Sequence, residues 1–323
     1  MPIKDTMKNM IRFGVMSTIL LSLPAAYALE ALDDQALSKT TGQDGISVGI
    51  GIDHLKFNQA AWIDQDGIAE PIFDQNYQQA AGVVMAGVDQ NPVKITFLGQ
   101  PQGATTVKAV IDAADVKGQP VMNIAVNFAN QINGIRVSPF ALYLAGSQAV
   151  SDENTTRSIF NVNGSLNPGV QKFLQVGSDA QNFEINLNSS AKPYLNIQLG
   201  NVPQGFMMIF GGAIQAICGT GEGCPITLVS GDTGASTIFQ AVATDRVNGF
   251  ALNGFHAGIE NTGLVIGNTG QSSKMDMHLK QVTLGNNGAA RADVFNGLPN
   301  GSMGSFGAIG GSVKDLKVTI KGL

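Results

Sequence analysis

A nucleophilic serine is the first chemistry to consider, because Gly45-Ile46-Ser47-Val48-Gly49 matches the pattern G-x-S-x-G. In hydrolases this pattern forms a sharp turn between a strand and a helix, which exposes the serine hydroxyl. Here apolar residues alternate with small or polar ones without a break from Ile46 to Asp53. That period of two predicts a strand running through Ser47, so we interpret this serine as a strand residue.

Two further runs contain the residue types of known catalytic centres. Asp232-Thr233-Gly234 resembles the active-site run of aspartic proteases, whose chemistry needs two such aspartates sharing one proton. A hairpin turn between strands at Ile226–Val229 and Thr237–Val242 explains the same residues. Ser189-Ser190-Ala191-Lys192 fits the pattern S-x-x-K, but the companion S-D-N and K-T-G elements are absent. We therefore predict that the protein is not an enzyme.

Carboxylates gather at one predicted turn. Asp64, Asp66 and Glu70 surround Gly67, and calcium prefers such oxygen ligands. The twelve-residue calcium-loop pattern is not completed, so a plain surface turn is favoured over a calcium site. The three histidines have no metal-ligand spacing. We predict no cofactor and no bound metal, with the turn as the one candidate.

The two cysteines, Cys218 and Cys224, are separated by a loop containing three glycines. Two thiols without a nearby histidine are too few ligands for structural zinc. A disulfide is favoured if the chain is exported, because oxidising compartments preserve such bonds. The loop is short, so the expected stabilisation is about 2 kcal/mol. We expect this bridge to secure the tip of a hairpin.

The beginning of the chain has the pattern of a secretory signal peptide. Basic residues precede an apolar run at Phe13–Leu23, and small residues follow at Ala26 and Ala28. An uncleaved membrane anchor is the alternative, but the run is short for a bilayer and Pro24 interrupts it. We predict cleavage after Ala28, export to the periplasm, the outer-membrane surface or a pilus, and no transmembrane helix in the mature chain.

Strand patterns dominate the remainder, because apolar and polar residues alternate with a period of two. The clearest examples are Ile46–Ile52, Ile124–Phe128, Phe183–Leu187, Leu195–Leu199, Met275–Leu279 and Val318–Ile320. One apolar and one polar face per strand is typical of antiparallel sheets with one wet face. The apolar stretch Phe206–Ile217 predicts two strands bent at Gly211-Gly212. We predict an all-β fold, either an antiparallel β-sandwich or an elongated rolled β-sheet.

Three regions follow from these patterns. Residues 1–28 form the signal peptide, and 29–45 form an N-terminal segment with a short capped helix. Residues 46–323 form the β-rich domain. A polar stretch at 146–158 fits a division into two sub-domains and a single long loop equally well.

Composition excludes several classes of protein. Charged residues are 13% of the 323 residues, about half the usual share, while apolar residues are 44%. A helical bundle would be richer in charged helix formers, and a disordered chain would be less apolar. The formal net charge of -5, with no basic cluster, argues against nucleic acid as a partner.

The start of the predicted mature chain resembles a known family. The motif LxDxxLSxxTGQxGI opens a family of exported bacterial proteins of unknown function, which includes FilA-like pilus assembly proteins. The matching positions are Leu32, Asp33, Asp34, Leu37, Ser38, Thr41, Gly42, Gln43, Gly45 and Ile46. The resemblance implies a role in a pilus or fimbrium, and the specific match covers only this segment.

These observations predict an exported structural or assembly protein of the cell surface or pilus, without catalytic activity. Its expected partners are other pilus or envelope proteins, bound by β-strand addition. Two alternatives stay open. One is a periplasmic carrier of an apolar ligand, with Phe206–Phe210 lining the pocket, because methionine adapts to varied shapes. The other is an outer-membrane β-barrel, although the chain has only one Trp and four Tyr for aromatic girdles.

Overall fold

The computed structural model describes residues 45–72, 75–150, 157–230, 233–286 and 301–321. Contacts divide the chain into two units, Met1–Ile46 and Ser47–Leu323. The predicted signal peptide, the short helix, the motif residues from Leu32 to Gln43, and Asp232 lie outside the described residues. Gly45 and Ile46 are described, and Ile46 begins the first strand.

The fold is almost entirely β, with 62% of the described residues in strands and 2% in helices, and the sheets are antiparallel. This confirms the predicted fold class. The short helical pieces are η1 (Val88–Gln90) and α3 (Ser147–Val150), and a small hairpin is formed by β4 (Ile68–Ile72) and β5 (Gln75–Tyr77). No described helix has the length and apolar character needed to cross a membrane.

The smaller sheet has eight strands in the described chain. In spatial order they are β1 (Ile46–Ile50), β8 (Val107–Val116), β9 (Gln119–Phe128), β14 (Tyr194–Gly200), β15 (Met208–Gly211), β20 (Phe255–Glu260), β21 (Gly263–Asn268) and β24 (Lys317–Ile320).

The larger sheet has fourteen strands among the described residues and branches at β18 (Thr233–Ala243). One branch contains β16 (Ala213–Ile217), β13 (Phe183–Leu187), β10 (Gly134–Val137), β7 (Val93–Leu98) and β2 (His54–Phe57). The other contains β17 (Cys224–Ser230), β12 (Val170–Val176), β11 (Phe140–Gly146), β6 (Ala81–Gly87) and β3 (Gln59–Asp64). Outside these branches are β19 (Phe250–Ala251) beside β16, β22 (Met275–Asn286) beside β18, and β23 (Gly301–Gly311) beside β22.

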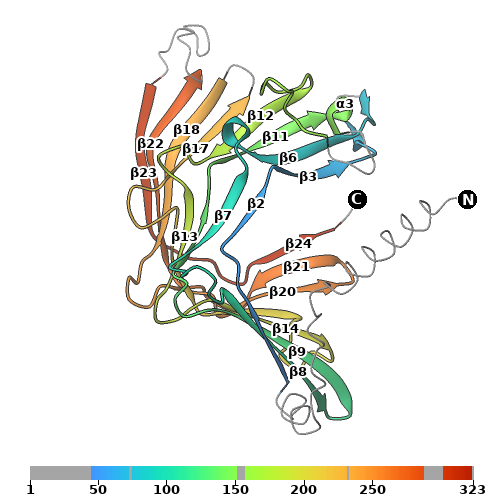
Figure 1. Cartoon of the computed structure of the whole chain (residues 1–323), viewed down its shortest axis with the longest axis vertical. Coiled ribbons are helices and arrows are strands. Elements are labelled where there is room, and N and C mark those ends of the chain that lie inside the picture. The colour runs from blue at the N-terminus through green and yellow to red at the C-terminus, as the bar shows by residue number, and fades with distance from the viewer. Residues whose placement is uncertain (1–44, 73–74, 151–156, 231–232, 287–300, 322–323) are drawn as a thin grey trace, which may run out of the picture. The chain divides into compact units, whose positions relative to one another are not determined.

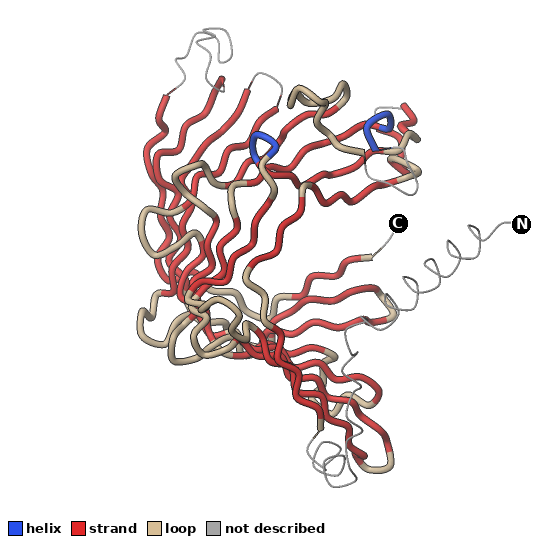
Figure 2. Tube along the Cα trace, viewed as in Figure 1, coloured by secondary structure: helices blue, strands red, loops and turns tan. Residues whose placement is uncertain are grey.

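Both sheets are built from the same long stretches of chain, which we call runs. Within the described residues, runs 1 to 8 are β1–β3, β6–β8, β9–β11, β12–β14, β15–β17, β18–β20, β21–β22 and β23–β24. Each run has strands in both sheets, and in each sheet the runs lie side by side in chain order. The topology is therefore one up-and-down meander whose long strands are interrupted by bends (Figure 1, Figure 2).

Backbone chemistry places the bends inside the runs. Pro139 separates β10 from β11, and it has no N–H to contribute to a ladder at that point. Gly212 separates β15 from β16 with a φ of +75°, and a β-carbon there would overlap the backbone of Lys192. The predicted bend at Gly211-Gly212 is thus confirmed, and it lies within run 5. The strands on either side of 146–158, β11 and β12, are neighbours in the larger sheet.

Two clusters of buried residues lie on the larger sheet. The first contains Val84, Ala86, Ala141 and Tyr143, and it packs against Ile159 of the loop that follows β11. The second, at the branch point, contains Val176 and the two cysteines, with Phe140 and Phe239 among the aromatic residues packed against it. The first cluster joins runs 2 and 3, and the second joins runs 4 and 5.

Candidate functional site

The smaller sheet has a row of apolar side chains across seven neighbouring strands. The members are register partners, so their side chains emerge on the same face. They are Ile111, Ile124, Ile197, Met208, Ala257, Ile266 and Val318. Two of them, Ile266 and Val318, are about two-fifths exposed, and the adjoining Ile320 is 54% exposed. This face is thus apolar but incompletely covered.

On β9 and β14 the opposite face is polar. The side-chain amides of Asn123 and Asn196 bond to each other, with N···O distances of 3.0 and 2.8 Å. Gln198 adds a third bond by donating to Oδ1 of Asn123 at 3.0 Å. The predicted alternation of one apolar and one polar face is therefore confirmed on these strands.

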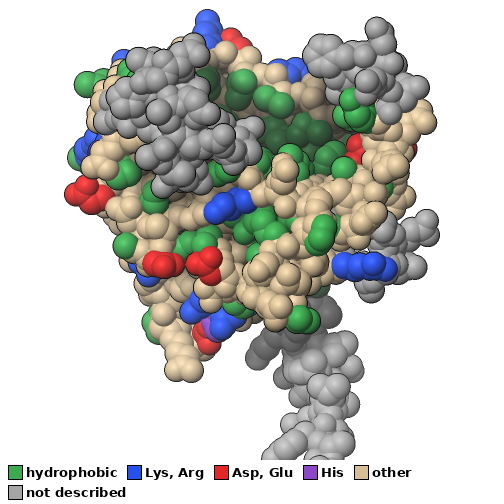
Figure 3. Space-filling view, turned by 90° about the horizontal axis from the view of Figure 1, so that it is seen from above, with side chains coloured by type: hydrophobic (Ala, Val, Ile, Leu, Met, Phe, Trp, Pro, Cys, Tyr) green, Lys and Arg blue, Asp and Glu red, His purple; other side chains and the backbone are tan. Residues whose placement is uncertain are grey.

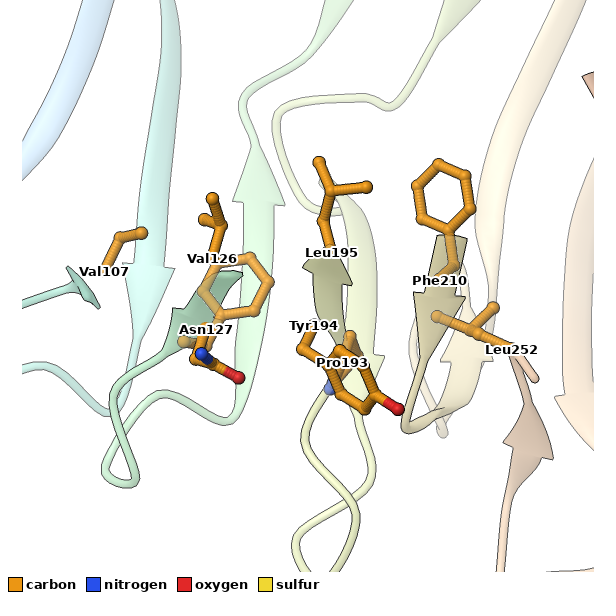
Figure 4. Close-up of a pocket in the computed structure, with 9 residues that line it drawn as sticks. Val107, Val126, Asn127, Pro193, Tyr194, Leu195, Phe210 and Leu252 are labelled. Carbon is orange, nitrogen blue, oxygen red and sulfur yellow. The ribbon is translucent and has the colours of Figure 1, made fainter. Parts of the chain in front are cut away.

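An apolar cleft of about 260 Å³ lies near the bends of runs 2 to 5. Its lining residues come from β8, β9, β14, β15 and adjoining loops: Val107, Val126, Asn127, Phe128, Pro193, Tyr194, Leu195, Phe210 and Leu252. Leu195 is the register partner of both Val126 and Phe210. Figure 4 shows these three side chains pointing in one direction, away from Asn127 and Tyr194. The cleft therefore continues the apolar face of the sheet.

The larger sheet has a second apolar row, again across seven strands. Its register partners are Ala60, Met85, Leu142, Leu174, Leu228, Ala235 and Leu284. Leu228 is 52% exposed, and Trp62, on the neighbouring row, is 70% exposed. In the view from above, hydrophobic side chains gather in a hollow of the surface (Figure 3). Apolar side chains are thus left partly open to solvent on both sheets.

Runs 1 and 8 are the outermost runs of the described part of the meander. Among the described residues, β23 pairs only with β22, and β24 only with β21. β23 has no charged residue and no proline, and it exposes Met303, Phe306 and Ile309, the last at 85%. At the other edge, β1 exposes Val48 and Ile50. Both edges therefore expose apolar side chains.

The predicted cysteine pair is at disulfide distance, with Cα atoms 5.1 Å apart. Its place differs from the expected hairpin tip. β16 and β17 are consecutive in the chain but lie end to end along β18, through the pairs Ile217–Ala241 and Cys224–Phe239. The disulfide closes the bend where the two branches of the sheet separate. The prediction of a hairpin was wrong because a bend within a long run has the same glycine-rich sequence as a hairpin turn.

The structure locates the other predicted site residues as follows. Ser47 lies within β1 and no helix follows it, as expected for a strand residue. Asp64 ends β3 and Asp66 lies in the turn before β4, where Oδ1 of Asp64 accepts a bond from the Gly67 amide at 3.1 Å. Glu70 lies in β4. In the part of the chain with described placement, no group of three or more His, Cys, Asp or Glu residues could hold a metal ion.

Asp276 is a polar centre that sequence reasoning missed. It is largely buried in β22, and its Oδ1 accepts bonds from the Thr244 hydroxyl at 2.6 Å and the Gly310 amide at 3.0 Å. Arg246 donates to Oδ2 at 3.1 Å. The Thr244 bond, followed by the Gly310 bond, holds the pKa of Asp276 below its usual value. The arrangement joins runs 6, 7 and 8, and a single aspartate between apolar residues has no sequence signal for it.

Comparison with known proteins adds a family match. Residues 7–118 match the model of a family of unknown function, DUF6160, and this region includes the motif from Leu32 to Ile46. No curated protein and no solved structure matches the chain. The family description assigns no activity, so the functional argument rests on the geometry of the cleft and the edges.

Proposed function

We propose that the protein is an exported, non-catalytic structural or assembly protein of the cell surface or a pilus, which joins its partners by β-strand addition. The observation that carries the proposal is β23. It is an uncharged, proline-free strand at the edge of the meander, and it exposes Phe306 and Ile309.

Edge strands in soluble proteins are usually protected, because their unpaired backbone groups accept strands from other chains. The protection comes from lysines, prolines, bulges or short length. β23 spans Gly301–Gly311 and contains neither lysine nor proline. Its pairing with β22 is interrupted by register shifts. Such a strand supplies backbone bonds for affinity and apolar side chains for specificity.

The two ends of the meander suit joining in series. Run 1 begins with β1, whose Val48 and Ile50 are exposed, and run 8 contains β23 and β24. The edge of run 8 would pair with an edge strand of a neighbouring pilus or envelope protein. This pairing would continue the antiparallel sheet into the neighbour. The predicted export signal and the resemblance of the opening motif to FilA-like proteins support the same role.

A lysine at Ile309 tests this proposal. Ile309 is 85% exposed, so Ile309→Lys should change folding stability by less than about 0.5 kcal/mol while placing a charge on the edge. Tagged full-length chains are expressed, surface appendages are removed by shearing, and the sheared fraction is quantified. The substitution should reduce recovery of the protein in that fraction at least tenfold.

The matched control is Val162→Lys, which adds the same charge at a fully exposed loop position. It should leave recovery unchanged. Equal recovery of both variants and the parent protein would overturn strand addition at β23, as would absence of the parent protein from the sheared material.

A second candidate function is the carriage of an apolar ligand. The cleft beside Phe210 is the observation that favours it, because one member of the predicted Phe206–Phe210 stretch lines that cleft.

A further inference from the structure

The cleft has a floor of register partners and walls from neighbouring segments. The floor is formed by Val126, Leu195 and Phe210. The walls include Val107 of β8 and Leu252 of the segment before β20. Leu252 is held in place by its backbone, since its amide donates to the Gly212 carbonyl at 2.8 Å. The walls thus come from four neighbouring runs and a loop fixed to one of the bends.

The chemistry of this lining excludes a charged occupant. None of the nine lining residues is acidic or basic. The polar side chains of Asn127 and Tyr194 point away from the floor (Figure 4). An ionised group placed on the floor would lose hydration without gaining a partner, which is costly. The part of a ligand that enters must therefore be uncharged and apolar.

The volume of the cleft and the direction of its apolar floor limit the ligands that fit. An apolar cavity of about 150 Å³ holds benzene, so by proportion a cavity of 260 Å³ holds roughly ten carbon atoms. Two residues further along the strands, Ile124, Ile197 and Met208 continue the floor on the same face. The apolar surface is therefore elongated along the strands, which fits a linear chain better than a compact ring system.

We propose that this cleft binds one unbranched hydrocarbon chain of about ten carbons, as found in an acyl or alkyl group, with its polar head outside. The hydrocarbon chain fills the cleft over Val126, Leu195 and Phe210, and the polar head lies toward Ile197. This deepens the second candidate function and does not depend on the edge strand β23. Loss of strand addition would leave this site intact, and the reverse also holds.

The test measures binding of neutral n-alcohols with six to twelve carbons to the purified, disulfide-bonded chain by titration calorimetry. Each added methylene should tighten binding about fourfold until the cleft is filled near ten carbons, after which the affinity should level off. A charged group at the tail end, as in 10-aminodecanol, should abolish the gain. Affinity that is independent of chain length, or undetectable binding of decanol, would overturn the proposal.

Substitutions locate the binding. Leu252→Trp places a larger side chain at the wall from a loop position, and it should weaken decanol binding at least tenfold. Val162→Trp, at a fully exposed position outside the cleft, is the control and should bind like the parent chain. Circular dichroism is used to check that both variants fold. If Leu252→Trp does not fold, Val107→Phe provides the same test from β8. Unchanged decanol affinity in a folded cleft variant would contradict binding at this cleft. Tighter binding of naphthalene than of decanol would contradict the preference for a linear chain.

Discussion

The ring of Tyr194 lies directly over Gly211, its register partner on the neighbouring strand, and a β-carbon at position 211 would overlap that ring. Tyr194 borders the cleft and is 42% exposed. The space above Gly211, which has no side chain, is where its ring packs on the sheet. The pair is an aromatic side chain covering a strand glycine, which compensates for the side chain that glycine lacks. It also connects the wall of the cleft to the bend at Gly212.

Gly211→Ala should destabilise the protein by about 1–3 kcal/mol, because the new methyl group forces the Tyr194 ring out of its place. In a Tyr194→Ala background the same change should stabilise by about 0.5–1 kcal/mol, because alanine is preferred over glycine within a strand. Urea unfolding of the four proteins measures both values. Gly221→Ala, which meets no atom within 4 Å, is the control. A cost that persists without the tyrosine ring would refute this explanation.

Removing the disulfide tests whether it stabilises the branch point. The double substitution Cys218→Ser/Cys224→Ser opens a short loop, whose closure contributes about 2 kcal/mol by chain entropy. Both cysteines are nearly inaccessible in the second buried cluster, so the serine hydroxyls add a further cost of roughly 1–3 kcal/mol. Denaturant unfolding of oxidised parent, reduced parent and double variant separates the two contributions. Equal stability of all three would show that the bridge is dispensable.

The sequence predicts those features that depend on residues close together in the chain. Alternation with a period of two is local, so it located β13 at Phe183–Leu187 and most of β24 correctly. The branching of the larger sheet was not predictable, because the loop between Cys218 and Cys224 has the composition of a hairpin turn although it is a bend within run 5.

The cleft shows the same limit. Phe210 lines the cleft, and the sequence left its stretch, Phe206–Phe210, open between pocket lining and plain core. Val126 and Leu195 lie in strands that were predicted, but their contact with Phe210 depends on cross-strand register. Register is set by pairing partners distant in sequence, so a single sequence does not specify it.

The side chain of Gln240 anchors the loop that the disulfide closes. Its Nε2 donates to the carbonyls of Gly221 at 2.7 Å and Gly219 at 3.1 Å, and the side chain is buried. Gln240→Leu keeps the volume but removes both bonds, and it should cost about 1–2 kcal/mol in the free energy of unfolding. Gln119→Leu, at an exposed position of β9, should change stability by less than about 0.5 kcal/mol.

Coupling provides a further check on Gln240. If glutamine and disulfide hold the same loop, the cost of Gln240→Leu should decrease in the Cys218→Ser/Cys224→Ser background, because the open loop no longer presents both carbonyls. Strictly additive costs would mean that Gln240 stabilises β18 independently of the loop.

Asp276 should make the last three runs sensitive to acid. Its pKa is lowered in the folded chain, chiefly by the Thr244 hydroxyl, from an ordinary value of 3.8. A carboxyl with a depressed folded pKa contributes stability that is fully present above 3.8 and is lost as pH falls through the folded pKa. Unfolding free energies measured from pH 7 down to pH 2 should therefore fall at the acid end.

Asp276→Asn should lower stability at pH 7 and flatten this acid dependence, since the asparagine side chain does not titrate. Some dependence should remain, because bonds from Asn248 and Val247 also lower the pKa of Asp245. Asp179→Asn, at an exposed turn position, should leave the profile unchanged. The assignment fails if the parent protein and Asp276→Asn lose stability in parallel between pH 4 and pH 2, because the carboxyl would then make no difference to the joining of runs 6, 7 and 8.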